Sequence, residues 1–130
     1  MTRPPIPADL RRFILTSIPS VPFLEAMLLL RAEPARDWAT ADVARRLYLP
    51  EPRAAELLQE LASAGIARSE TARGATNWRF APATDELAAM LDRLATQYAA
   101  DLVGVSDLIH SRVDKKAQHF ADAFRWRKDS

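Results

Sequence analysis

Residues 40–66 read TADVARRLYLPEPRAAELLQELASAGI, and this stretch decides the fold. Thr40 stands before a short apolar pattern over 41–48 and is a predicted helix N-cap. Two closely spaced prolines then mark a tight turn. A second helix is predicted over 52–64, and Gly65 follows it where a left-handed C-terminal residue is favoured. The stretch therefore predicts two helices joined by a tight turn.

A change of period follows Gly65. Residues 66–72 and 77–81 are short extended runs, and the second run alternates aromatic with polar side chains. The intervening residues 73–76 contain a glycine and are the predicted tip of a hairpin.

Two helices are predicted before the decisive stretch. Residues 1–8 are rich in proline and are predicted to be a flexible arm. Asp9 is a predicted N-cap for a helix over 10–18. The next helix, over 21–31, is apolar nearly all round, so we expect it to be buried on most sides.

This order of elements resembles the winged helix-turn-helix superfamily, in particular small bacterial regulators of the MarR or PadR kind. The resemblance covers about residues 21–100 and is carried by TADVARRLYL, PEP and AAELLQELASAGI within residues 40–66. It implies a mainly α fold with a small β-hairpin: a winged-helix domain over 9–83, with a long helical C-terminal extension over 84–130. It also implies a bacterial, cytoplasmic transcriptional regulator that binds double-stranded DNA as a homodimer, although a fold alone does not fix function.

Proteins that resemble this chain usually insert the helix at 52–64 into the major groove of DNA. The face of that helix opposite its leucine stripe is mostly acidic or amide-bearing, so phosphate contacts must come from arginines elsewhere. The expected DNA-binding residues are Arg45, Arg46, Arg53, Glu56, Gln59, Arg68, Arg73 and Arg79.

Two alternative functions stay open. Carboxylates repel a polyanion, so the acidic helix 52–64 also suits a protein-protein interaction module that does not bind DNA specifically. The basic and aromatic C-terminus at 120–128 could contact such a protein partner. A ligand-responsive regulator, with a pocket between the core and the long helix, is the third interpretation.

The C-terminal segment carries an apolar stripe with an eleven-residue period, typical of a nearly straight helix. An unbroken helix over 85–127 would be about 65 Å long, about twice the width of a monomer this size. Either a bend near Gly104 or a second chain must cover the stripe. The predicted dimerisation residues are Leu91, Tyr98, Leu102, Ile109, Phe120 and Phe124.

Charge within the same segment favours an antiparallel pair of chains. Residues 84–110 carry one basic and five acidic groups, a net charge of −4, whereas residues 111–130 carry six basic and three acidic groups, a net charge of +3. Antiparallel pairing would place unlike halves together, and so would a tail folded back on its own chain.

Composition and motifs argue against catalysis. The chain has 130 residues, a formal net charge of +1 and no cysteine. The only two histidines, His110 and His119, lack enough neighbouring ligands for a metal site. No phosphate loop, nucleophile motif, signal peptide or membrane-spanning stretch is recognisable. We therefore expect a cytoplasmic protein that is not an enzyme and needs no cofactor or metal.

Overall fold

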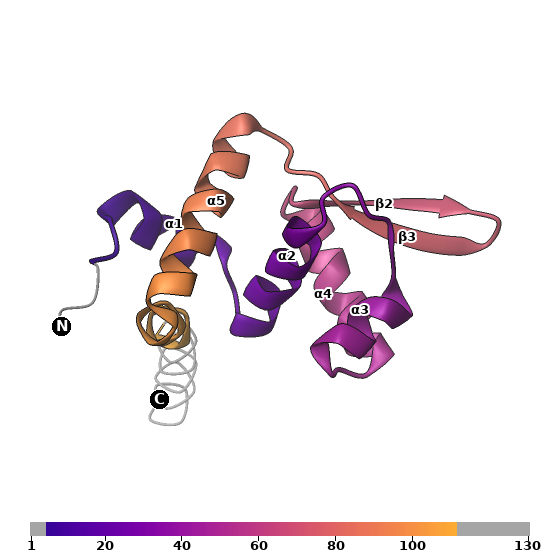
Figure 1. Cartoon of the computed structure of the whole chain (residues 1–130), viewed down its shortest axis with the longest axis horizontal. Helices are drawn as coiled ribbons and strands as arrows, with labels where there is room; N and C mark the ends of the chain where they lie inside the picture. The colour runs from indigo at the N-terminus through magenta and orange to yellow at the C-terminus, as the bar shows by residue number, and fades with distance from the viewer. Residues whose placement is uncertain (1–4, 112–130) are drawn as a thin grey trace, which may run out of the picture.

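The computed structural model describes residues 5–111, which form a mainly helical fold around a small antiparallel sheet (Figure 1). The elements are α1 (Ala8–Ser17), α2 (Val21–Ala32), β1 (Trp38–Ala39), α3 (Thr40–Leu47), α4 (Glu51–Ser63), β2 (Ala67–Ala72), β3 (Ala75–Phe80) and α5 (Asp85–Ala100). Residues 102–111 are helical again after a break at Asp101. The strands lie in the order β1-β3-β2. The predicted fold class is confirmed.

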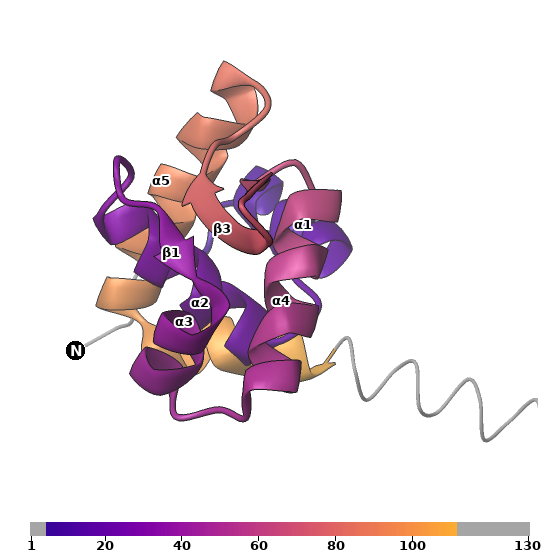
Figure 2. The ribbon, with the colours of Figure 1, turned by 90° about the vertical axis from the view of Figure 1, so that its right-hand side faces the viewer.

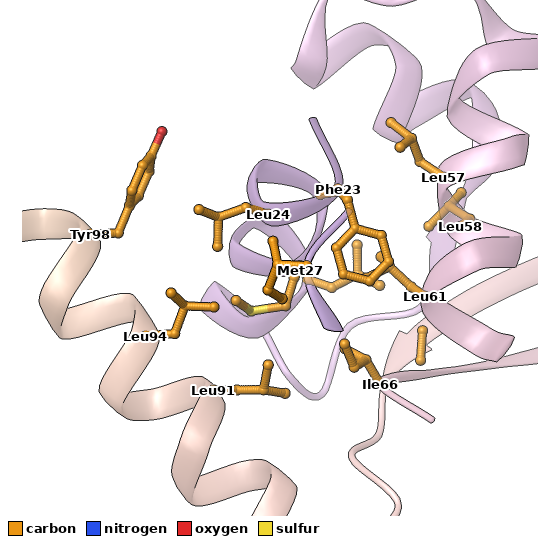
Figure 3. Close-up of a cluster of buried hydrophobic side chains, with 14 of the residues drawn as sticks. Phe23, Leu24, Met27, Leu57, Leu58, Leu61, Ile66, Leu91, Leu94 and Tyr98 are labelled. Atoms are coloured by element: carbon orange, nitrogen blue, oxygen red, sulfur yellow. The ribbon is translucent and has the colours of Figure 1, made fainter. Parts of the chain in front are cut away.

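Helix α2 lies at the centre of the core. Figure 3 shows its side chains Phe23, Leu24 and Met27 between leucines of α4 and leucines of α5. All three side chains are buried, as are Leu58 of α4 and Leu91 of α5. A helix that is apolar nearly all round can be covered on two sides, and this explains the predicted and observed position of α2.

The predicted hairpin is present, with a tip of only two residues. Ala72 pairs with Ala75, and Arg73 and Gly74 have φ values of 53° and 78°. Positive φ at both positions is the geometry of the tight turns that match the twist of paired strands.

Strand β1 was not predicted from the sequence. Trp38 pairs with Trp78, and Ala39 pairs with Asn77, so β1 completes a three-stranded sheet. Two residues are too few to show the alternation from which a strand can be recognised.

Two of the predicted helix caps are wrong. The N-cap of α3 is Ala39, and the hydroxyl of Thr40 instead accepts a hydrogen bond from Trp78 Nε1 at 3.0 Å. The N-cap of α1 is Pro7, with Asp9 in the first turn. In contrast, Thr84 caps α5 by accepting from the Leu87 N–H at 3.0 Å.

Of the two alternatives for the C-terminal segment, the structure shows a bend, because α5 ends at Ala100. Asp101 has φ −148° and ψ 70°, and its Oδ1 accepts a hydrogen bond from the Gly104 N–H at 3.0 Å. This carboxylate therefore caps the next helical segment, and the chain bends three residues before the glycine at which a bend was expected. Because of the bend, Ile109 returns to the core.

The predicted dimerisation residues occupy different environments. Leu91 and Ile109 are fully buried within this chain and Tyr98 is nearly so, whereas Leu102 is 57% exposed. Tyr98 and Ile109 are therefore covered within this chain, as the alternative of a bend near Gly104 requires. Phe120 and Phe124 lie outside the described residues.

The elements separate into two ends of the molecule. Helices α3 and α4 lie at one end with the β2–β3 hairpin, and α1, α5 and residues 102–111 lie at the other (Figure 1). Figure 2 views the first end, with the turn between α3 and α4 at its lower edge. Of the predicted arm, residues 1–4 are not described, and Ile6 packs against the core.

Within residues 5–111, no single helix has the length and apolar character needed to cross a bilayer. Only α1 and α2 taken as a pair reach that length and composition, and they are bent by 106° at the break between them.

Candidate nucleic-acid interface

Helix α4 presents a polar face of mixed charge. Its leucines are buried in the core, which leaves Glu56, Gln59 and Glu60 exposed. Arg53, the only basic residue of this helix, donates to Glu56 Oε2 at 3.0 Å. The face predicted to meet DNA is therefore accessible, but its one cation is already paired with a carboxylate.

The arginines of α3 lie in its last turn, as predicted. Arg45 is exposed and forms an ion pair with Asp42 at 2.7 Å. The guanidinium of Arg46 lies 5.5 Å from the ring centroid of Trp38, and that of Arg36 lies 3.6 Å from the same centroid. A cation within about 6 Å of an indole face is attracted by the ring, so Trp38 positions both arginines.

The hairpin carries three arginines. Arg79 donates to Asp37 at 2.9 Å, and Arg68 stands directly opposite Arg79 in the strand register. Arg73 is exposed at the tip. Among the described residues, neither Arg68 nor Arg73 has an ion pair with a carboxylate.

These ion pairs do not prevent the arginines from binding phosphate. Each joins side chains that are partly or largely exposed, where such pairs contribute only about 0–1 kcal/mol. A phosphate that offers a charge-assisted, bidentate hydrogen bond can therefore replace the carboxylate partner at little cost. The predicted arginines are thus available to a polyanion, from both α3 and the hairpin.

Tyr48 was missed by the sequence analysis, which placed it at the end of a helix. It is 94% exposed and lies between α3 and α4, with φ 56° and ψ 45°. Its position, directly after the last helical residue, is one where glycine or asparagine is usual. A bulky residue there is the signal that could have drawn attention to it.

Two surface hollows adjoin the helices. One of about 380 Å³ lies where the turn after α1 meets the end of α4, and one of about 330 Å³ lies between α1 and α5. The second is lined by Pro7, Leu10, Asp92, Arg93, Thr96 and Gln97. It is the feature that comes nearest to the ligand pocket expected beside the long helix.

No cluster of three or more potential metal-ligating side chains occurs within residues 5–111. His110 is exposed on the helical segment 102–111. His119 lies outside the described residues.

No family model matches this chain. No curated protein matches it either.

Solved structures do resemble it. The MepR–DNA complex of S. aureus is 13% identical with a TM-score of 0.53, over 94% of this chain and 87% of that one. The PcaV transcriptional regulator of Streptomyces coelicolor is 21% identical with a TM-score of 0.52, over 93% and 85%. A winged helix-turn-helix DNA-binding domain from Mycobacterium bovis, described as homodimeric, is 16% identical with a TM-score of 0.52, over 72% and 83%.

The PcaV protein is described as a transcriptional regulator, and the Mycobacterium bovis domain as a possible one. Identities of 13–21% support a common fold and no finer function. The chain therefore has a winged helix-turn-helix fold of the MarR-like kind.

Proposed function

We propose that this protein is a transcriptional regulator of the cytoplasm that binds double-stranded DNA as a homodimer. The observation that carries the proposal is the arrangement at one end of the molecule. There α3, α4 and the β2–β3 hairpin lie together (Figures 1 and 2). The polar face of α4 is exposed, and so are the arginines of α3 and the arginine at the hairpin tip.

In this mode α4 enters the major groove and the hairpin follows the adjacent backbone. Glu56 and Gln59 of α4 can pair with base edges, since a carboxylate accepts from cytosine and an amide pairs with adenine. They give no affinity for phosphate, so Arg46, Arg68 and Arg73 supply it. The interface thus divides into a base-reading helix and basic flanks that position it.

One observation favours a second function, a protein-interaction module that does not bind DNA specifically. The face of α4 is net acidic, and its only arginine is paired with Glu56 at 3.0 Å. A basic partner surface would complement this face directly, whereas DNA needs compensation from the flanking arginines. The two proposals therefore predict different effects of removing a carboxylate from α4 on the binding of the respective partner, DNA or a protein.

The test is binding of the full chain to random-sequence duplex DNA across a salt series. Arg46→Ala and Arg73→Ala should each weaken binding to all sequences alike and flatten the salt slope by about one unit. Glu56→Gln should leave affinity unchanged or raise it. Arg11→Ala, an exposed arginine of α1 at the other end of the molecule, is the charge-matched control and should change neither quantity.

No binding of the wild-type chain to duplex DNA at low salt would end the DNA proposal. The interaction module would then take its place. Equal losses for Arg11→Ala and Arg73→Ala would mean that net charge, rather than this end of the molecule, determines the affinity.

The homodimer is supported by the placement of exposed apolar side chains. Leu102 and Val103 are 57% and 49% exposed on the helical segment after α5, at the end opposite the hairpin. A dimer built there would leave both DNA-facing ends accessible, and two-fold symmetry would place them on two half-sites. Phe120 and Phe124 remain proposed contributors from the tail.

A further inference from the structure

The turn between α3 and α4 exposes a large aromatic side chain that adds nothing to the fold. Tyr48 is 94% exposed, the most exposed of the large hydrophobic side chains among the described residues. A ring in water contributes no packing energy, because apolar surface stabilises a fold only when it is removed from solvent. Core packing therefore does not explain the tyrosine.

Backbone geometry also disfavours a tyrosine at this position. The Leu49 N–H donates to the Ala44 carbonyl at 2.9 Å, and the Tyr48 N–H donates to the Arg45 carbonyl at 3.4 Å. These two bonds close α3 in the ending that places a left-handed residue directly after the helix. A Cβ is crowded in that conformation, so glycine would fit better. Strained residues of this kind gather at binding sites.

Tyr48 has two basic neighbours. Arg45 and Arg46 lie in the last turn of α3, and both are exposed. The three side chains are here called the Tyr48 patch. Two carboxylates border it, since Asp42 pairs with Arg45 at 2.7 Å and Glu51 opens α4. A phenol at the end of a helical turn that carries two exposed arginines adds a hydrogen-bond donor to theirs for an anionic oxygen.

We infer that the Tyr48 patch binds the sugar-phosphate backbone of DNA, with Tyr48 as the central contact. The inference rests on the proposed function. When α4 enters the major groove and α3 crosses the backbone, the turn that joins them lies at the edge of the groove. The Tyr48 hydroxyl there donates to a phosphate oxygen, and the ring packs on the neighbouring deoxyribose. Such contacts fix the register of the protein rather than the sequence that it reads.

We expect Tyr48→Gly to change the stability of the protein and its affinity for DNA in opposite directions. In the full chain, Tyr48→Gly should raise Tm by about 2–4 °C, because it relieves the left-handed strain. The same variant should bind random duplex DNA at least about ten-fold more weakly, the loss expected for a hydrogen bond to a charged group. Tyr48→Phe keeps the strain and the ring but loses the hydroxyl, so its Tm should not change and its affinity should fall about ten-fold.

The salt series separates this contact from a general loss of charge. Tyrosine is neutral, so both variants should lower affinity without changing the salt slope, whereas Arg46→Ala should flatten it by about one unit. Arg11→Ala, at the other end of the molecule, is the control and should leave Tm, affinity and slope as in the wild-type chain.

Three outcomes would overturn the inference, and they differ in what they leave standing. If Tyr48→Gly binds DNA as tightly as the wild-type chain, the Tyr48 contact is wrong and the DNA-binding function stands. If the wild-type chain binds no duplex DNA at low salt, both are wrong. If Tyr48→Gly changes the mass of the protein in solution, the ring joins copies of this chain instead of contacting DNA.

Discussion

At the scale of single residues, the core of this protein depends on leucines that α4 directs towards α2. Leu58 is fully buried, and Gln59 beside it is exposed. We expect Leu58→Ala to lower the free energy of unfolding by roughly 2–5 kcal/mol, the cost of an unfilled cavity. Gln59→Ala on the same helix should change it by less than about 0.5 kcal/mol. Denaturant unfolding followed by circular dichroism measures both, and a small loss for Leu58→Ala would mean that the helix register is wrong.

A second residue-scale prediction concerns the ion pair that joins α1 to α5. Both terminal guanidinium nitrogens of Arg93, Nη1 and Nη2, donate to Asp9, at 2.6 and 2.8 Å. This hydrogen bonding lowers the pKa of Asp9 from 3.8 to about 2. A carboxyl whose pKa is depressed by folding stabilises the protein above its ordinary pKa, and the stabilisation is lost as the pH falls through the folded value.

The Asp9–Arg93 contribution should therefore be complete above about pH 4 and disappear as the pH falls towards 2. We expect Asp9→Asn to have a lower Tm than the wild-type chain at pH 7, and the difference to shrink over that acidic window. Arg93→Met in the Asp9→Asn background serves as the control, because the second change should cost little once the pair is broken. A Tm difference that stayed constant down to pH 2 would contradict this assignment.

At the scale of elements, the break after α5 depends on one capping side chain. Asp101 is buried, and its carboxylate accepts from the Gly104 N–H at 3.0 Å. A Cβ at position 104 would collide with that carboxylate, so the glycine leaves room for the cap. Asp101→Ala should cost about 0.5–2 kcal/mol, the usual loss for a helix cap. Asp101→Asn retains an accepting oxygen and should recover most of it. Equal losses for both variants, measured by thermal unfolding, would exclude capping as the role of Asp101.

Most of the elements could be predicted from the sequence alone. The helix pair, the turn, the hairpin and the buried α2 follow from periodicity, prolines and Gly65, because these signals are local. The break at Asp101 could not be located from the sequence. A continuous apolar pattern with an eleven-residue period does not show whether the second half of the segment continues the helix or folds back. In the folded chain Tyr98 and Ile109 occupy one core despite the bend between them.

The candidate interface was less predictable than the fold. The positions of the arginines could be read from the sequence, but their partners could not. Arg79 pairs with Asp37, which directly precedes the two-residue strand β1, and Arg46 lies over the ring of Trp38. Tyr48 carries no periodic signal, and the role proposed for it rests on its exposure and its left-handed backbone.

At the scale of the whole molecule, a winged-helix protein that reads two half-sites must pair through a surface away from its hairpin. Leu102 and Val103 are the exposed large hydrophobic side chains at that end of the described chain. A charge placed at either position would lose its hydration in a dimer interface. This loss costs far more free energy than the same charge costs on an exposed surface. We therefore expect the full chain to be a dimer at tens of micromolar, and Leu102→Glu with Val103→Glu to be a folded monomer by sedimentation equilibrium.

Truncation after Ser111 separates this surface from the tail that carries Phe120 and Phe124. A dimer that becomes monomeric on truncation, yet survives Leu102→Glu with Val103→Glu, would show that the tail alone joins the two chains. Loss of the dimer in both variants would show that the surface formed by Leu102 and Val103 acts together with the tail. A monomer in the untruncated wild-type chain would rule out the homodimer. DNA binding would then have to depend on a single α4 and hairpin, with a footprint of one half-site and no preference for palindromic sequences.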